Sequence, residues 1–133
     1  MSVQKHALYE LPVPSTELES GGPYLCADTL RYEYFRGDEL VRSGLRFAKI
    51  SAIRRRSERT STPAHIEGNY DTLVEVDNSQ WLAEVLAESS AAWRQDLSKQ
   101  HHYMIYLDGL GCLEVLAESW IALPEAAGSW PET

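Results

Sequence analysis

The chain has 133 residues and a formal net charge of −8, with 44% hydrophobic and 24% charged residues. This composition is ordinary for one globular domain and excludes the apolar-poor, highly charged make-up of a disordered chain. No apolar run approaches the ~20 residues that cross a bilayer, and no apolar stretch of a secretion signal follows Lys5 and His6. We therefore expect a single cytoplasmic domain that makes no contact with a membrane.

The two ends of the chain differ from its middle. Residues 1–23 contain three prolines and two glycines, and their clearest apolar positions are Leu8, Tyr9 and Leu11. Such a segment is typical of a tail or of an arm laid on the folded body. We place a single domain at 24–123 and an irregular C-terminal tail at 124–133, with Trp130 docked on the body.

A first hairpin is predicted around Gly37 and Asp38, because glycine suits the first position of a two-residue type II′ turn. Folding there puts apolar and aromatic residues on one face and charged residues on the other, with Glu33 and Arg42 as an ion pair. The predicted pairs are Phe35 with Leu40, Tyr34 with Val41, Glu33 with Arg42, Tyr32 with Ser43 and Leu30 with Leu45. Beyond Phe47 the apolar phase slips, which indicates a bulge or a strand buried on both faces, and a bend in the strand.

The segment 57–69 is polar and contains Pro63 and Gly68, so we expect a loop there, with a short edge strand around 65–67 as an option. A strand follows at 70–76. A long amphipathic helix is then predicted over 79–98, with Asp77, Asn78 or Ser79 accepting hydrogen bonds from its first amides. Its apolar face consists of Leu82, Val85, Leu86, Trp93 and Leu97, with Ser89 among them.

A second hairpin spans 102–120 with a three-residue loop ending in Gly111, so that Asp108 faces Cys112. The pairs on one face are then all apolar or aromatic: Leu107 with Leu113, Ile105 with Val115 and Tyr103 with Ala117. A helix over 113–123 also fits the apolar spacing there, but the strand explains both halves of the hairpin together. The hexapeptide Glu-Val-Leu-Ala-Glu-Ser occurs at 84–89 and at 114–119, and its unlike flanks do not indicate a repeat.

These elements predict an α+β fold. We expect a mostly antiparallel, curled sheet of about five to six strands packed on the one long amphipathic helix, because each buries the apolar face of the other. Cys26 and Cys112 belong to no metal-binding or redox motif, so they are predicted to be small buried thiols, bridged only if their strands meet.

The densest group of catalytic residue types lies before the strand at 70–76. His65 and Glu67 project to one side if their segment is extended, and Asp71 follows shortly after. A histidine with carboxylate partners is suited to general base catalysis, or to divalent metal binding, with help from His102 or Tyr70. A solvated loop histidine is the more frequent arrangement, so neither a metal nor a cofactor is predicted.

The second face of the 102–120 hairpin carries the aromatic candidates. His102, Met104, Tyr106 and Trp120 share this face, with His102 opposite Glu118. Covering by a helix or by a second copy of the chain is favoured over an open groove for a ligand or partner.

Motifs of known chemistry are missing. Nine of the twelve Lys and Arg residues lie between 31 and 59, including Arg54, Arg55, Arg56 and Arg59, but no glycine-rich phosphate loop accompanies them. The acid-rich remainder repels nucleic acid, so none is expected to bind.

The leading hypothesis is a non-catalytic binding module that engages a protein partner or itself. The alternative is a small acid–base or metal-dependent enzyme or ligand binder at His65, Glu67 and Asp71.

Overall fold

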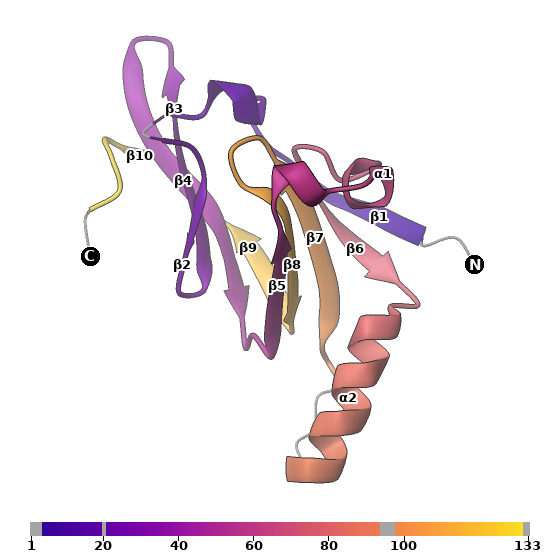
Figure 1. The fold of residues 1–133 in the computed structure, drawn as a ribbon. Helices are drawn as coiled ribbons and strands as arrows, with labels where there is room; N and C mark the ends of the chain where they lie inside the picture. Colours follow the sequence, from indigo (N-terminus) through magenta and orange to yellow (C-terminus); the bar gives the residue numbers. More distant parts are fainter. Residues whose placement is uncertain (1–3, 20, 94–97, 132–133) are drawn as a thin grey trace.

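The computed structural model describes residues 4–19, 21–93 and 98–131, and of residues 90–93 the backbone alone. Two five-stranded antiparallel sheets form the body, the second on the left of Figure 1. In the first sheet the strand order is β1 (Gln4–Glu10), β6 (Thr72–Asp77), β7 (His101–Leu107), β8 (Gly111–Ala117) and β5 (Ala52–Arg56). In the second sheet the order is β10 (Ala126–Ala127), β4 (Glu39–Ala48), β3 (Thr29–Arg36) and β2 (Tyr24–Cys26), and β9 (Ser119–Ala122) also pairs with β4.

The core lies between these sheets. The first sheet contributes Leu73, Tyr103, Ile105, Leu107, Leu113, Val115 and Ala117, and the second contributes Leu30, Tyr32, Tyr34, Val41, Leu45 and Phe47. The rings of Phe47 and Tyr103, one from each sheet, have centroids 5.8 Å apart. Side chains alternate along a strand, so each sheet turns one apolar face inward and covers that of the other.

Two chain segments run from one sheet into the other. β4 continues into β5, and β8 continues through Glu118 into β9, while β4 stays paired with β9 and β5 with β8. At the bend Lys49 has a φ angle of 54°, and the Glu118 amide donates to the carbonyl of Ala48. The bend predicted beyond Phe47 is confirmed. It allows one antiparallel pair to form a corner that joins both sheets.

The first hairpin has the predicted register in all five pairs, and Gly37 has a φ angle of 65°. Glu33 and Arg42 face each other in the ladder as expected. Arg42 donates to the carbonyls of Ala127 and Ser129, each at 3.0 Å, and Glu33 accepts the amide of Trp130. The C-terminal segment is thus held against this hairpin, and Trp130 docks as predicted.

The second hairpin is a strand pair as predicted, but its register was wrong by two positions, because Leu107 faces Gly111 and Tyr106 faces Cys112. The amide of Asp108 donates to Ser15 Oγ instead of joining the ladder, which places Asp108 in the loop. A shift of two residues keeps every side chain on its predicted face. The strand at 113–123 is confirmed as β8 and β9.

The predicted α+β fold is wrong. Strands hold 50% of the residues and helices 17%, and there are two sheets rather than one sheet packed on a helix. The helix α2 (Gln80–Trp93) begins where predicted but projects beyond the strand ends in Figure 1, and none of residues 80–89 is buried. Its predicted continuation at 94–97 lies outside the described residues. The two sheets already cover each other, so no inner apolar face remains for a helix.

Segments expected to be irregular take part in the sheets. Gln4–Glu10 forms the edge strand β1 against β6, so the first part of 1–23 is an arm joined to the body. β10 pairs with β4 within the predicted C-terminal tail. Both cysteines are unpaired, with Cys112 buried and Cys26 half-buried. No helix among the described residues is long and apolar enough to span a membrane.

The segment 57–69 contains the helical turns Glu58–Thr60 and α1 (Pro63–Ile66), so the optional edge strand at 65–67 does not form. Thr62 caps α1 by a capping box: its own amide and hydroxyl both pair with Nδ1 of His65. Pro63 occupies the first turn, where a missing amide proton costs nothing. This local chemistry favours a helical turn over an extended segment.

Candidate functional site

A pocket of about 630 Å³ opens on the outer face of the first sheet, between α1 and the start of α2. We call it the relay pocket. Its floor is formed by His102 of β7 and Glu114 of β8, which point outward because their neighbours Tyr103 and Val115 point into the core. Ser79 and Trp81 form one wall.

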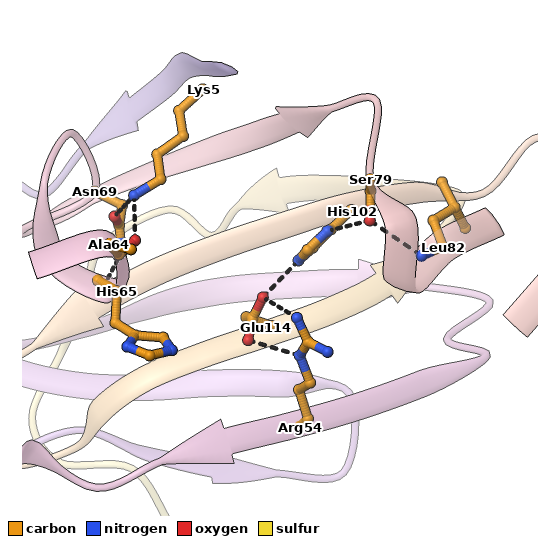
Figure 2. A network of polar contacts seen from close by, with 9 residues as sticks. All are labelled: Lys5, Arg54, Ala64, His65, Asn69, Ser79, Leu82, His102 and Glu114. Atoms are coloured by element: carbon orange, nitrogen blue, oxygen red, sulfur yellow. Dashed lines mark hydrogen bonds and ion pairs between the residues drawn. The ribbon is translucent and has the colours of Figure 1, made fainter. Parts of the chain in front are cut away.

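A chain of hydrogen bonds crosses the relay pocket (Figure 2). Ser79 Oγ lies 2.6 Å from Nδ1 of His102, and Nε2 of His102 lies 2.8 Å from Oε1 of Glu114. The amide of Leu82 donates to the same Ser79 Oγ at 3.0 Å, so Ser79 is the N-cap of α2, as one of three predicted residues. Both His102 and Glu114 are buried, at 4% and 6% exposed.

Glu114 is held as a carboxylate. Arg54 lies opposite it in the ladder and donates from Nε to Oε2 at 2.7 Å and from Nη2 to Oε1 at 3.0 Å. Burial raises the pKa of Glu114, but hydrogen bonds from His102 and Arg54 outweigh this and lower the pKa to about 2. An ionised carboxylate has no proton to donate, so the proton of this contact belongs to Nε2 of His102.

Trp81 packs against two members of this network. The guanidinium carbon of Arg54 lies 4.1 Å from the centroid of the Trp81 ring, and the His102 ring meets it edge-on at 5.2 Å. A cation over an indole face and a perpendicular ring pair are both favourable geometries. The first turn of α2 therefore fixes the orientation of Arg54 and His102 as well as of Ser79.

The opposite wall of the pocket belongs to α1 and to Lys5 of β1. Lys5 Nζ donates to the carbonyls of Ala64 and Glu67 and to Oδ1 of Asn69, at 2.6 to 2.8 Å. Burial lowers the pKa of Lys5. These three bonds tie α1 and the residues after it to the edge of the sheet, and Figure 2 shows those to Ala64 and Asn69.

His65 presents a donor to the pocket. The Thr62 amide donates to its Nδ1 at 2.9 Å, so this nitrogen is unprotonated and the proton of the neutral ring lies on Nε2. Burial, followed by the charge of Arg56, lowers the pKa of His65. His65 also lines a smaller adjoining pocket with Arg54, Arg55, Arg56 and Glu114.

The three residues predicted as a catalytic group do not come together. No hydrogen bond or ion pair joins His65 to Glu67 or Asp71 in the part of the chain that the structure describes. Glu67 is exposed, and Asp71 has a φ angle of 54° and a buried Oδ1 without a hydrogen-bond partner. Within the described ranges no three His, Cys, Asp or Glu side chains are arranged to hold a metal.

The residues predicted for binding divide between two places. His102 and Met104 line the relay pocket, and the buried Tyr106 packs beside Met104 under α1. Tyr70 is exposed, meets the Tyr106 ring edge-on at 5.6 Å and donates its hydroxyl to Asp108. Trp120 packs on the core between the sheets instead, 5.8 Å from the Tyr9 ring, because the bend at Glu118 interrupts the alternation that would have placed it with His102.

The sequence did not point to Ser79, Glu114 or Trp81 as members of a site. Arg54 was considered only as part of an arginine run able to hold a phosphate or an acidic partner, with a solvated strand end favoured. The register error paired His102 with Glu118, whereas its backbone partner is Leu116 and its side chain bonds Glu114. A signal was present, because alternation alone puts Glu114 on the same outer face as His102 and Met104. Comparison with models of protein families, with curated proteins and with solved structures found no match to this chain.

Proposed function

We propose that this chain is a binding module that holds a small carboxylate- or phosphate-bearing ligand beside the relay pocket. The observation that carries the proposal is a set of donors without acceptors. Arg54 uses Nε and Nη2 for Glu114, and its Nη1 has no partner among the described residues. His65 directs its Nε2 proton toward the same region. Arg56 donates from Nη1 to the carbonyl of Thr60 at 3.2 Å and adds its remaining N–H groups.

Charge at this site favours an anion. The protein as a whole carries −8, but Lys5, Arg54 and Arg56 surround the single buried carboxylate of Glu114. Asp77 also lines the relay pocket, so the two pockets together hold four cations, Lys5, Arg54, Arg55 and Arg56, against two carboxylates, Asp77 and Glu114, which leaves an excess of positive charge. We call Arg54, Arg56 and His65 the anion site. Fixed guanidinium and imidazole donors recognise carboxylate and phosphate oxygens well, because little conformational freedom is lost on binding.

Titration with inorganic phosphate and with citrate, followed by calorimetry and amide chemical shifts, tests this proposal. We expect saturable binding that weakens with added salt. Arg56→Gln should weaken it about 5- to 10-fold, the loss of one charge-assisted hydrogen bond. Arg59→Gln is the matched control, since Arg59 is exposed and lines neither pocket, and it should bind like the parent chain. No saturable binding, or equal loss in both variants, contradicts the proposal.

A second proposal is that the chain binds a protein partner or a second copy of itself. The predicted face of His102, Met104, Tyr106 and Trp120 does not offer a surface for this. Met104 and Tyr106 are 5% and 6% exposed, too little for a contact face. The exposed Tyr24, Phe35 and Ile121 on the second sheet are better suited to such a contact. Light scattering over a range of concentrations tests self-association. A strict monomer at high concentration would remove the homodimer.

A further inference from the structure

We propose that Ser79 is a nucleophile for acyl transfer, with His102 as its general base and Glu114 as the group that orients and stabilises the imidazole. This inference deepens the proposed function and rests on it for the substrate, an ester or thioester of a small acid that carries a second anionic group for Arg54 and Arg56. Nothing local in the sequence marks these three residues, which come from three separate elements.

The proposal depends on which atom donates in the hydrogen bonds that join Ser79, His102 and Glu114. Arg54 grips both oxygens of Glu114, so this carboxylate is ionised and accepts the Nε2 proton of His102. In the neutral imidazole Nδ1 of His102 then has a lone pair, and the Ser79 hydroxyl donates to it across the contact of 2.6 Å. The path from hydroxyl to imidazole to carboxylate is the one that activates a serine, with the two ring nitrogens exchanged in role.

The surroundings of Ser79 favour negative charge on its oxygen. Oγ already accepts the Leu82 amide, and such a bond strengthens as the oxygen gains charge. Gln80 and Trp81 also line the pocket, and the first amides of a helix have no acceptor within it. They supply donors for the oxygen of a carbonyl that Ser79 attacks. Cys112 is no competing nucleophile, because burial and then the charge of Glu114 raise its pKa to about 12.

The reaction balances with water as the second reactant. Ser79 Oγ forms a bond to the acyl carbon, and its proton passes to Nδ1 of His102. The bond from the acyl carbon to the alcohol or thiol breaks, and the leaving group takes that proton. Water then attacks the acyl-serine, gives a proton to His102 and releases the acid, while the returning proton restores the Ser79 hydroxyl. Glu114 stays ionised throughout and stabilises the transient imidazolium.

A structural role for the same contacts is the competing explanation, and one substitution separates the two. Asparagine is as good an N-cap as serine, so Ser79→Asn keeps the cap of α2 and removes the nucleophile. Serine to alanine is less informative, because it also costs about 1 kcal/mol of helix capping. His102→Gln removes the base, and circular dichroism with a thermal unfolding curve shows whether each variant is folded.

The test is covalent labelling with an uncharged alkyl fluorophosphonate, read by intact mass and peptide mapping, followed by hydrolysis of p-nitrophenyl butyrate. We expect one label on Ser79 and ester turnover in the parent chain, and neither in the folded Ser79→Asn variant. His102→Gln should slow labelling by about 100-fold or more, the usual contribution of a general base. A labelling rate that rises with pH supports the same role.

Two results overturn the inference: no Ser79 label under conditions that label a known serine hydrolase, or equal ester turnover in the parent chain and Ser79→Asn. Because the fluorophosphonate probe is uncharged, labelling of Ser79 does not depend on the anion site. Phosphate binding without a Ser79 label would leave the binding module and remove the nucleophile. A Ser79 label without phosphate or citrate binding would leave the nucleophile and remove the anionic substrate class.

Discussion

Arg54 and Glu114 face each other across the β5–β8 ladder and meet through two parallel hydrogen bonds, of 2.7 and 3.0 Å. The arginine side chain is half exposed, whereas the glutamate side chain is only 8% exposed. A buried carboxylate is costly unless it is paired, and here it accepts from His102 as well. This ion pair therefore links the stability of the first sheet to the protonation state of Glu114.

The first prediction concerns acid stability. Glu114 has a folded-state pKa of about 2, below its ordinary value of 4.5, so its contribution to stability is complete above pH about 4.5 and is lost as the pH falls toward 2. A shift of this size corresponds to about 3 kcal/mol. Glu114→Gln should lower the free energy of unfolding by about 2 kcal/mol at pH 7 and flatten its decline between pH 4.5 and 2.

Urea unfolding at a series of pH values measures this effect. The matched control is Glu67→Gln, because Glu67 is exposed and its side chain makes no hydrogen bond among the described residues. Its unfolding free energy should stay within about 0.5 kcal/mol of the parent chain. An identical acid profile for both variants would show that the pairing of Glu114 does not govern acid stability.

The second prediction separates the observed fold from the one expected from sequence. Leu45 of β4 is fully buried between the sheets, and Leu86 of α2 is only partly covered. Leu45→Ala should cost about 2–5 kcal/mol through lost burial and the cavity left behind. Leu86→Ala should cost under about 1 kcal/mol. Chemical denaturation compares them, and a larger loss at Leu86 would mean that α2 packs on the body after all.

The third prediction concerns the turn that opens β8. Gly111 has a φ angle of 93°, and a Cβ there would lie 2.3 Å from the carbonyl oxygen of Arg56. Gly111→Ala therefore combines backbone strain with a backbone clash and should cost more than about 3 kcal/mol. Gly128 has a similar φ angle of 87° with open space around it, so Gly128→Ala carries the strain of about 1 kcal/mol alone. The difference between the two melting temperatures measures the clash.

The fourth prediction concerns the wall of the relay pocket that is formed by α1. Lys5→Met keeps most of the apolar stem but removes three hydrogen bonds to residues 64–69. We expect faster amide hydrogen exchange across 64–69 and a loss of about 1–3 kcal/mol, since the acceptors lose a charged donor. Lys99→Met, at an exposed lysine, is the control for removing a charge. Unchanged exchange in Lys5→Met would show that α1 is held by other contacts.

Much of the strand pairing could be predicted because it depends on local chemistry. Gly37 with Asp38 and the alternation around it led to the correct register of β3 and β4, since a two-residue turn leaves one way to pair the flanking strands. The loop at 108–110 was harder to predict. Its register depends on Ser15, ninety-three positions away from Asp108, whose hydroxyl takes the Asp108 amide out of the ladder.

The candidate site was predicted in small part only. His102 was singled out as a binding residue, but its partners lie on other elements, and a register error of two hid Glu114. The proposed group of His65, Glu67 and Asp71 depended on an extended segment, which the capping box of Thr62 and His65 converts into a helical turn. Proximity in sequence was a poor guide, because the relay pocket assembles residues from seven elements.

The hexapeptide Glu-Val-Leu-Ala-Glu-Ser shows that local sequence alone does not determine secondary structure. At 84–89 it is helical, and at 114–119 it runs through β8 and β9. By itself the sequence determined turns, caps and the alternation of faces, because these depend on the φ angles and hydrogen bonds of adjacent residues. Only the tertiary structure decided the state of each copy. The N-cap Ser79 starts a helix in which none of residues 84–89 is buried, whereas β7 and β5 supply backbone partners on both sides of β8.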